Sequence, residues 1–413
     1  MNLFESGKTA RDAARILATT SAEIKNNALR FIAEDLRKYA DKILSANAVD
    51  IENAVKSGMS KAMIDRLTLS KERINSIADG VLKVCDLPDP IGEVISASKR
   101  PNGLQIAKRR VPLGVVAVIY ESRPNVTADT AVLCLKSSNA CILRGGKEAI
   151  NSNIAIADIM IEAVKRAGLP DGTITLIRDI SRETATELMH LNEYIDVLIP
   201  RGGAGLINAV IKNATVPVIQ TGVGNCHIYA DKDCNIDMAV KILINAKASR
   251  PSVCNAAETL LIHKDIDPAF FEKASKALAE HNVEIRACER CIDKFSGAIA
   301  ASDKDFETEF NDYILSVKVV DSIDDAIAHI DKYGTGHSEC IVTENYTRAN
   351  AFLDRVDAAA VYVNASTRFT DGFEFGFGAE IGISTQKMHA RGPMGLNELT
   401  SVKYVITGNG QIR

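Results

Sequence analysis

The feature that most constrains the fold is a regular alternation of short β-rich runs with helical stretches. In the first half of this region, helical stretches such as Asn153–Ala167 and Arg182–His190 separate the β-rich runs. Because parallel strands need a long crossover connection, usually a helix, this alternation predicts a parallel sheet with helices on both faces. The predicted strands are Val115–Tyr120, Ala140–Arg144, Ile174–Ile177, Val197–Ile199 and Val218–Gln220.

The alternation recurs from Asp237 to about Asp371 and predicts a second α/β domain. A glycine-rich segment from Gly372 to Gly378 follows it. The predicted strands are Thr259–His263, Tyr313–Val320, Ser338–Val342 and Ala360–Asn364, and the predicted helices are Pro268–His281, Ile323–Lys332 and Thr347–Val356.

The two ends of the chain fall outside this pattern. About the first 85 residues are predicted to be helical, with Ser21 as an N-cap. Asn102-Gly103 joins two alternating stretches and predicts a hairpin, because both residues tolerate positive φ. We expect this charged hairpin to be an oligomerisation arm. Ser401–Ile406 is predicted to be a last strand, paired either with the hairpin or with the sheet of a neighbouring subunit.

Composition limits the class of protein. The 413 residues are 46% hydrophobic and 25% charged, which is typical of a globular chain with two or three structural units. The longest apolar runs are too short to span a bilayer, and Met1–Glu5 lacks the features of a signal peptide. A net charge of −4 offers no general attraction to nucleic acid. The nine scattered cysteines fit a reducing compartment. We therefore expect a cytoplasmic protein without membrane or nucleic-acid partners.

One cysteine pair, Cys288 and Cys291, forms a CxxC motif. A metal site or redox site of the usual kind would need a second such pair or a histidine pair at ligand spacing, and none follows. We interpret the motif as a coincidence of spacing on a helix, and we expect no metal site.

Two glycine-rich segments, Arg144–Lys147 and Arg201–Gly205, follow predicted strands. Their glycines either serve only a tight turn or let the backbone approach a pyrophosphate. Arg144 and Lys147 place two positive charges at the carboxyl edge of the sheet, where ligands bind in such folds. Neither a GxGxxG fingerprint after a strand nor a P-loop motif is present.

Cys254 lies between a helical stretch and the apolar run Leu260–Ile262, close to Arg250. A thiolate is a strong nucleophile, and a nearby positive charge raises its population at neutral pH. Free cysteines are also among the most buried residues, so an inert core thiol is the alternative interpretation.

Seven short segments in order carry a family resemblance across essentially the whole chain. They are Val111–Val116, Tyr120–Thr127, Leu143–Glu148, Gln220–His227, Arg250–Asn255, Tyr333–Glu339 and Phe375–Gly382. The chain resembles the aldehyde dehydrogenase superfamily and, within it, the gamma-glutamyl phosphate reductases. The resemblance implies an α/β fold with two Rossmann-like parallel-sheet domains and a small β oligomerisation arm. It implies a cofactor-binding domain of residues 1–90, 111–230 and 372–398, a catalytic domain of residues 231–371, and an arm of residues 91–110 and 399–413.

The resemblance also implies roles for individual residues. Cys254 matches the catalytic cysteine, and Asn125 matches the amide that helps to form an oxyanion hole. Lys147 stands where many relatives carry a glutamate that would repel a 2′-phosphate, which favours NADP(H), although Glu148 lies next to it. The implied cofactor-binding residues are Arg144, Gly145, Gly146, Lys147, Arg201, Gly202, Gly203 and Phe375, and the candidate substrate contacts are Arg123, Arg250 and His337.

Gln220 stands where hydrolytic members of the superfamily carry a general-base glutamate. An amide cannot take a proton from water at neutral pH, so a thioester on Cys254 would receive hydride rather than water. The implied activity is NADPH-dependent reduction of L-glutamyl 5-phosphate to L-glutamate 5-semialdehyde and phosphate, in proline biosynthesis. The alternatives are a hydrolytic or CoA-acylating member of the superfamily, or a catalytically silent binding subunit. A functional link to a separate glutamate 5-kinase and a homodimer or homotetramer are also implied.

Overall fold

The computed structural model describes residues 2–413, and contacts between Cα atoms divide the chain into two compact units. The first unit contains the chain up to Thr221, together with Gly376–Gly382 and Met394–Arg413. The second unit contains Gly222–Phe375 and Ile383–Pro393. Within the described residues, no helix has the length and apolar character needed to cross a membrane.

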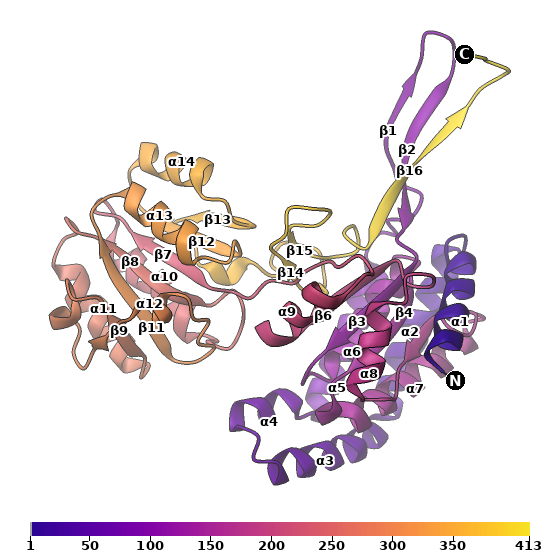
Figure 1. Ribbon diagram of the computed structural model, residues 1–413, viewed down its shortest axis with the longest axis horizontal. Coiled ribbons are helices and arrows are strands. Elements are labelled where there is room, and N and C mark those ends of the chain that lie inside the picture. Colours follow the sequence, from indigo (N-terminus) through magenta and orange to yellow (C-terminus); the bar gives the residue numbers. More distant parts are fainter. Residues whose placement is uncertain (1) are drawn as a thin grey trace. The chain divides into compact units, whose positions relative to one another are not determined.

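The first unit is built on a parallel sheet with the strand order β5-β4-β3-β6 (Figure 1). Every residue of its central strand β3 is buried, as expected when helices cover both faces of a parallel sheet. The strands are β3 (Val115–Tyr120), β4 (Ala140–Gly145), β5 (Ile174–Leu176) and β6 (Val197–Arg201). The helices that follow or connect them are α6 (Asn125–Lys136), η1 (Lys147–Ala149), α7 (Ile150–Arg166), α8 (Arg182–Met189) and α9 (Ala204–Asn213).

The N-terminal region of this unit is helical, as predicted. The side chain of Ser21 accepts a hydrogen bond from the backbone N–H of Ile24, so Ser21 is the N-cap that the sequence indicated. The helices are α1 (Leu3–Leu17), α2 (Ala22–Lys38), α3 (Ala40–Lys56), α4 (Lys61–Leu67) and α5 (Lys71–Asp86).

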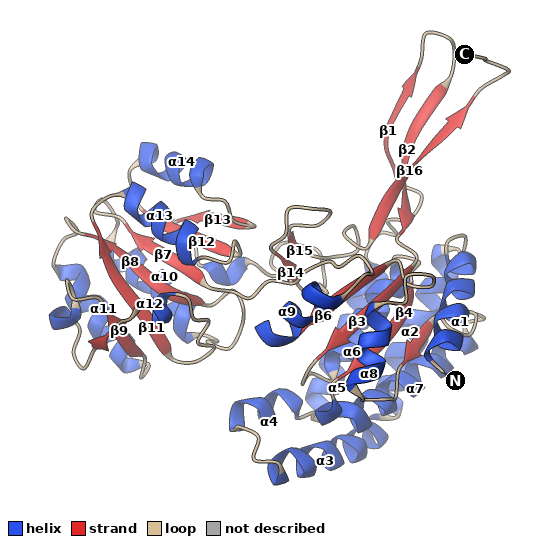
Figure 2. Ribbon diagram, in the orientation of Figure 1, coloured by secondary structure: helices blue, strands red, loops and turns tan. Residues whose placement is uncertain are grey.

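An antiparallel three-stranded sheet extends from the first unit (Figure 2). It contains β1 (Val94–Lys99), β2 (Gln105–Pro112) and β16 (Thr400–Thr407). Gly103 has a φ of +91° in the turn between β1 and β2, consistent with the Asn-Gly turn that the sequence predicts. β16 pairs with β2 along its whole length, so the last strand joins the hairpin of its own chain.

The second unit is built on a larger parallel sheet with the strand order β10-β9-β11-β8-β7-β12-β13. Its strands are β7 (Cys226–Ala230), β8 (Ala257–His263), β9 (Glu284–Ala287), β10 (Ile299–Ala300), β11 (Ile314–Val320), β12 (Ser338–Val342) and β13 (Ala360–Val363), with a separate pair of β14 (Ile383–Ser384) and β15 (Gly392–Pro393). Its helices are α10 (Ile236–Ala248), α11 (Ala269–Glu280), η2 (Ile292–Lys294), α12 (Asp303–Phe306), α13 (Ile323–Tyr333), α14 (Tyr346–Arg355) and η3 (Thr367–Phe369).

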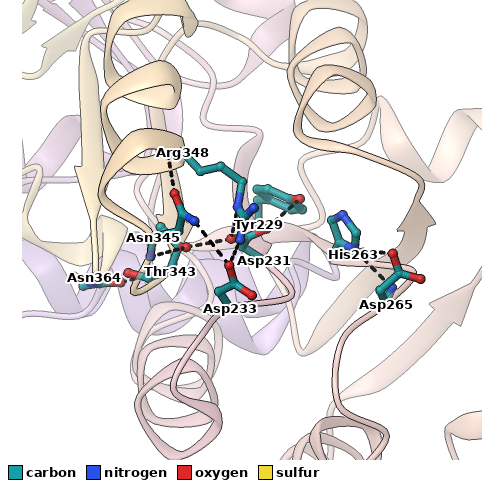
Figure 3. A network of polar contacts seen from close by, with 9 residues as sticks. All are labelled: Tyr229, Asp231, Asp233, His263, Asp265, Thr343, Asn345, Arg348 and Asn364. Carbon is teal, nitrogen blue, oxygen red and sulfur yellow. Dashed lines mark hydrogen bonds and ion pairs between the residues drawn. The ribbon is translucent and has the colours of Figure 1, made fainter.

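A polar network joins the carboxyl ends of β7 and β12 to α14 (Figure 3). Asp231, which follows β7 and is fully buried, accepts hydrogen bonds from Thr343 Oγ1 and from Arg348 Nε, both at 2.6 Å. The Tyr229 hydroxyl donates to the same carboxylate at 3.3 Å. These bonds satisfy a buried charge and fix α14 to the sheet. Histidine and aspartate residues gather here, yet none of the described residues form a group able to hold a metal ion.

The predicted fold class is confirmed, since both units contain parallel sheets flanked by helices. Two local predictions differ from the structure. Val218–Gln220 makes only an isolated bridge between Val218 and Leu198, because the chain leaves the sheet at once. Cys288 and Cys291 lie in a turn after β9 rather than on a helix, because the strand ends only one residue earlier. β7, which we expected within the cofactor-binding segment 111–230, pairs in the sheet of the second unit.

Candidate active site

Cys254 lies in a turn of the second unit between α10 and β8. The backbone of this turn is tight, since Ala256 N–H donates to Val253 O at 3.0 Å. The thiol of Cys226, in β7, donates to the carbonyl oxygen of Cys254 at 3.2 Å. Cys254 is partly exposed, so the inert core interpretation does not apply to it.

Asn255 holds this turn in place. Its side-chain amide donates to the carbonyl oxygens of Thr370, at 2.9 Å, and Arg368, at 3.2 Å. The Thr367 hydroxyl donates to the Asn255 carbonyl at 2.7 Å, and the Arg368 guanidinium donates to the Asn255 side-chain oxygen. The residue after the candidate nucleophile is therefore bound on all sides to η3 and the chain that follows it.

Gly224 leaves room for the Cys254 backbone. A Cβ atom added at Gly224 would lie 1.5 Å from the carbonyl oxygen of Cys254, a distance at which atoms overlap. Only glycine permits this approach. The Gly224 N–H donates to the Glu309 carboxylate at 2.9 Å, which fixes the segment before β7.

Positive charge gathers near Cys254. Burial is the first cause that lowers the pKa of Arg368, and the charge of Arg250 lowers it further, whereas a Cys254 thiolate would raise it. Arg250 itself is exposed on the same turn. A guanidinium within electrostatic reach of a thiol favours the thiolate form that nucleophilic chemistry needs.

His337, the third candidate substrate contact, is an uncharged ring at neutral pH, and its role as a contact stays a prediction. It is fully buried, and burial lowers its pKa to about 4. The ring is therefore neutral at pH 7. Its Nδ1 atom lies 2.8 Å from the Ser338 hydroxyl and 3.6 Å from the thiol of Cys226. Cys226 in turn contacts the Cys254 backbone, because its thiol donates to the Cys254 carbonyl oxygen.

Asn125 lies in the first unit, at the first residue of α6. Its side-chain Nδ2 donates to the carboxylate of Asp129, one turn later, at 2.8 Å. Burial raises the pKa of Asp129 to about 6, although the hydrogen bond from Asn125 and the charge of Arg201 both lower it. An amide nitrogen carries two N–H groups, so this bond orients the second one.

The turn after β6 holds an anionic oxygen at the start of α9. The Gly203 N–H donates to the Glu121 carboxylate at 2.9 Å, and a Cβ atom at Gly202 would lie 2.4 Å from the same carboxylate oxygen. A carboxylate oxygen here stands in for a phosphate oxygen, because helix N-termini favour both. The cradle therefore fits one phosphate group of a dinucleotide cofactor.

The turn after β4 has a similar construction. A Cβ atom at Gly146 would lie 2.2 Å from the Glu148 carboxylate, which accepts hydrogen bonds from the N–H and the hydroxyl of Ser122 at 2.6 and 2.8 Å. A Cβ atom at Gly145 would lie 2.1 Å from the side chain of Asn153. Gly145 therefore lets the Asn153 side chain pack closely, and the Glu148 carboxylate lies against Gly146.

The other predicted cofactor residues have different surroundings. Arg144 donates to the carbonyl oxygens of Ile180 and Ser181 at 2.8 and 3.0 Å, so its guanidinium also holds the chain before α8. The Lys147 side chain is exposed beside this turn. Arg201 contacts Gly382, where an added Cβ atom would lie 2.3 Å from its guanidinium. Phe375 is 40% exposed and belongs to the second unit.

Arg123 and Gln220 belong to the first unit. Arg123 lies two residues before the start of α6, where its carbonyl accepts the Val126 N–H at 3.1 Å, and Gln220 stands just before the boundary between the units. Their roles remain predictions.

Three residues of the site were not predicted from the sequence: Asp129, Asn255 and Arg368. Asp129 had a local signal, because it lies one helical turn after Asn125. Asn255 lies next to Cys254, but the partners that give it a role are more than 100 positions away, and Arg368 follows Asn255 by 113 positions. No local pattern reveals contacts at such separations.

Comparison with known proteins extends this description. A sequence profile of the aldehyde dehydrogenase family matches residues 5–291 and 299–405. Gamma-glutamyl phosphate reductase of Heliobacterium modesticaldum is 61% identical over 407 residues, covering 98% of each chain. The same enzyme of Clostridium perfringens is 61% identical over 411 residues, covering 100% of this chain and 99% of the relative.

Solved structures agree with these relatives. The crystal structure of gamma-glutamyl phosphate reductase from Thermotoga maritima has 48% sequence identity and a TM-score of 0.97, with 100% of both chains covered. An acetylating aldehyde dehydrogenase from Geobacillus thermoglucosidasius, at 20% identity and a TM-score of 0.71, shares the fold. Taken with the partly exposed Cys254 and the two anion-holding turns, these matches show that the chain belongs to the aldehyde dehydrogenase family.

Proposed function

We propose that this chain reduces L-glutamyl 5-phosphate to L-glutamate 5-semialdehyde and phosphate with NADPH, the second step of proline biosynthesis from glutamate. The observation that carries the proposal is full-length identity of 61% to gamma-glutamyl phosphate reductases. The braced turn that presents Cys254 supports it independently, because acyl transfer through a thioester needs a positioned thiolate.

In the proposed reaction, the Cys254 thiolate attacks the acyl carbon of the substrate. The carbon–oxygen bond to phosphate breaks, phosphate leaves, and a thioester remains on Cys254. When bound, the nicotinamide cofactor supplies the hydride that reduces this thioester. The resulting thiohemiacetal collapses to the aldehyde and releases the Cys254 thiolate, so the enzyme returns to its starting state.

Asn125 and the Cys254 backbone N–H are the proposed donors to the oxyanion that forms during the attack. Such a donor contributes about 3 to 4 kcal/mol to the stabilisation of the transition state. The bond between Asn125 and Asp129 supports this role, because a pre-oriented amide needs no reorganisation when charge develops. Asp129 is then a positioning residue.

The proposed cofactor site uses the two glycine turns of the first unit. Gly202 and Gly203, with Arg201 beside them, would hold a phosphate where the Glu121 carboxylate now lies. Gly145 and Gly146 would leave room for the adenosine end, with Arg144 and Lys147 offering positive charge. A cation favours the 2′-phosphate of NADP over the 2′-hydroxyl of NAD. Phe375 is also proposed to contact the cofactor.

The proposed substrate contacts are Arg123 and Arg250, to which we add Arg368. Guanidinium groups pair with phosphate and carboxylate groups in two-point geometry, which suits a substrate with both. Arg368 is favoured by its position beside Cys254 and Arg250.

The decisive test is an assay of the purified protein in the reverse direction. We expect reduction of NADP by glutamate 5-semialdehyde to require inorganic phosphate, and we expect the Cys254→Ser variant to lose at least about 1,000-fold in kcat/KM. Cys234→Ser is the control, because Cys234 is a partly exposed cysteine of the same unit outside the site. Formation of acid without phosphate, or a requirement for CoA, would assign the chain to another branch of the family.

The proposed assembly is a homodimer or homotetramer that works beside a separate glutamate 5-kinase in the cytoplasm. The exposed three-stranded arm supports an oligomer, because so small a sheet has too little core of its own. The nine cysteines are scattered along the chain, as is common in proteins of a reducing compartment.

A further inference from the structure

Cys288 and Cys291 lie in a turn of the second unit that the proposed reaction does not use. β9 ends at Ala287, and the chain then turns so that the Cys291 N–H donates to Cys288 O at 3.0 Å. This turn brings the two sulfur atoms to 3.6 Å from each other. Disulfide formation therefore needs only a small movement of side chains, since bonded sulfur atoms lie about 2.05 Å apart.

The two thiols have unequal surroundings. Cys291 is fully buried in the hydrophobic core beneath β9 and β11, whereas Cys288 is partly exposed at the edge of that core. The backbone N–H of Val319 donates to the Cys288 sulfur at 3.4 Å. The Cys291 thiol faces the carbonyl oxygens of Cys288 and Val317, at 3.7 and 3.9 Å, which accept rather than donate hydrogen bonds. The geometry thus supports a thiolate on Cys288 and a protonated thiol on Cys291.

The pKa values agree with this asymmetry. The hydrogen bond from Cys291 is the main cause that lowers the pKa of Cys288 to about 5, with contributions from the N–H groups of Val319 and Arg290 and from the Arg290 charge. The same contact, followed by burial, raises the pKa of Cys291. An exposed thiolate beside a buried thiol is the arrangement of an attacking and a resolving cysteine.

Space for a reaction partner lies beside Cys288. A cavity of about 320 Å³ is lined by Arg290 and Val319, both of which contact Cys288, and by Lys318 and Lys332. Asp321 and Asp325 also line the cavity, and Asp321 forms an ion pair with Arg290 at 2.8 Å, so the positive charges are largely balanced. The cavity therefore offers space for a small, uncharged or weakly charged molecule next to two residues that contact Cys288.

This pair lies apart from Cys254. β8, β11 and β9 run parallel, Cys254 precedes β8, and Cys288 follows β9, so the two cysteines lie at opposite edges of the sheet. In the strand register, Val317 of β11 lies opposite both Leu260 of β8 and Ala287 of β9, so Leu260 and Ala287 are two strands apart. Ala257 lies three residues before Leu260, which places it about 14 Å from Ala287 at usual strand spacings. A disulfide needs Cα atoms within about 7 Å, so Cys288 has Cys291 and not Cys254 as its partner.

We propose that Cys288 and Cys291 form a reversible dithiol–disulfide site, in which Cys288 reacts with a low-molecular-weight disulfide and Cys291 resolves the product. The Cys288 thiolate attacks one sulfur of the small disulfide, a new sulfur–sulfur bond forms, and one small thiolate leaves. Cys291 loses its proton to that thiolate and attacks the Cys288 sulfur, and the second small thiolate leaves. The protein dithiol is oxidised, and one small disulfide is reduced to two thiols.

The test treats the full-length wild-type protein with 2-hydroxyethyl disulfide, an uncharged probe, followed by alkylation of remaining thiols and digestion with trypsin. Trypsin cleaves after Arg290, between the two cysteines. The disulfide therefore joins two separate peptides, Ala287–Arg290 and Cys291–Lys294, which mass spectrometry detects as one linked species. We expect this species to form and to disappear after treatment with a dithiol reductant.

Cys234 is the matched internal control, because it is also partly exposed in the second unit. Burial raises its pKa to about 11. At pH 7 the thiolate fraction of Cys288 is then about 10⁴ times that of Cys234. Each Cys288 thiolate is about 500-fold less nucleophilic, because nucleophilicity falls with pKa. Cys288 is therefore expected to react about 20-fold faster than Cys234. Equal or slower reaction of Cys288, or a lasting probe adduct on Cys288 without the linked species, would overturn the proposal.

Two variants separate the roles of the cysteines. In Cys291→Ser, the probe's thiol should remain attached to Cys288, because the resolving group is absent. In Cys288→Ser, neither the linked species nor an adduct on Cys291 should appear, because Cys291 is buried. An adduct on Cys291 in that variant would contradict the assignment. The wild-type comparison with Cys234 needs no substitution, so a folding defect in a variant does not obscure the result.

Discussion

Gly224 shows how a residue without a side chain can position the candidate nucleophile. Its Cα atom lies directly behind the Cys254 backbone, and a Cβ atom there would meet the oxygen, carbonyl carbon and Cα of Cys254 at 1.5, 2.3 and 2.6 Å. All three are backbone atoms, so no rotation of a side chain can relieve the overlap. Only displacement of the Cys254 turn can.

The Gly224→Ala variant is therefore expected to lose activity more than stability. A displacement of about 1 Å at a reacting group lowers the rate about 100-fold, whereas overpacking costs about 1 to 3 kcal/mol of the free energy of unfolding. Steady-state kinetics and thermal unfolding measure the two effects. Gly80→Ala on α5 is the control, because a Cβ atom at Gly80 has no neighbour within 4 Å. A kcat/KM within twofold of wild type would show that Gly224 does not position Cys254.

Lys147 offers a separate test of cofactor choice. Its exposed cation lies beside Gly146 at the proposed adenosine end of the cofactor site. A charge-assisted hydrogen bond contributes about 2 kcal/mol, so Lys147→Glu should lower the ratio of kcat/KM for NADPH to that for NADH about 30-fold. Lys276→Glu, an exposed substitution on α11, should leave the ratio unchanged. A fall in kcat/KM for both cofactors alike would point to a role without 2′-phosphate selectivity.

Glu258 predicts a pH dependence of stability. It is 1% exposed and forms a 2.5 Å ion pair with the fully buried Lys247. Burial raises the pKa of Glu258 to about 7 from an ordinary value of 4.5, although Lys247 opposes the shift. The folded state thus binds this proton more tightly than the unfolded state does. Its contribution to stability is present below pH 4.5 and is lost as the pH rises through about 7.

The Glu258→Gln variant should accordingly show a smaller fall in the free energy of unfolding than wild type between about pH 4.5 and about pH 7. Denaturant titrations across this range give the two slopes. Identical slopes in the two proteins would mean that Glu258 is ionised throughout the range.

At the residue scale, sequence reasoning identified side chains whose chemistry is visible in their own neighbourhood. The Asn102-Gly103 turn and the Ser21 cap belong to this class, since each depends on a few adjacent residues. Arg368 does not belong to it. Its contact with Asn255 depends on β8 and η3 meeting in the folded unit, which no window of sequence contains.

At the element scale, the arm shows a choice that the sequence left open. The last strand had two available partners, because a strand with alternating exposed residues fits any free antiparallel edge. The structure pairs β16 with β2 of the same chain. The CxxC motif was misassigned for a related reason, since four residues after a short strand such as β9 carry too few periodic positions to separate a turn from a helix.

The arm retains exposed apolar side chains on one side of β16. Tyr404 is 66% exposed and Ile406 is 59% exposed, and both point to the same face because they are two residues apart. A sheet of this size with an uncovered apolar face is typical of an interface between copies of a chain. The Tyr404→Asp/Ile406→Asp double variant should weaken self-association at least about 100-fold, or about 3 kcal/mol.

Light scattering after size-exclusion chromatography measures this effect, and circular dichroism checks that the units remain folded. Lys403→Gln is the control, because Lys403 points to the opposite face of β16. An unchanged mass for the double variant, at concentrations where wild type is oligomeric, would exclude this face of the arm from the interface.

At the scale of the whole molecule, the chain passes between its two units at four positions, after residues 221, 375, 382 and 393. Each unit has its own parallel sheet and its own share of the proposed chemistry. The second carries Cys254, and the first carries Asn125, Gln220 and the glycine turns. A division of this kind was predictable as two α/β patterns. The exact crossing points were not, because β14 and β15 are two residues long and have no sequence signature.

Gln220 gives the sharpest prediction about the fate of the proposed thioester intermediate. If the thioester on Cys254 persists because no base activates water, a carboxylate at position 220 should allow hydrolysis. General-base catalysis contributes 10²- to 10⁴-fold, and a base in a site not evolved for it should reach about the lower end. The Gln220→Glu variant should therefore oxidise glutamate 5-semialdehyde to glutamate without phosphate, about 10- to 100-fold faster than wild type.

Chromatographic measurement of glutamate, with NADP and with or without phosphate, detects this change. Gln105→Glu, on the exposed arm, should form no more acid than wild type does. If Gln220→Glu also forms no additional acid, the absence of a base at position 220 is not what protects the thioester from water.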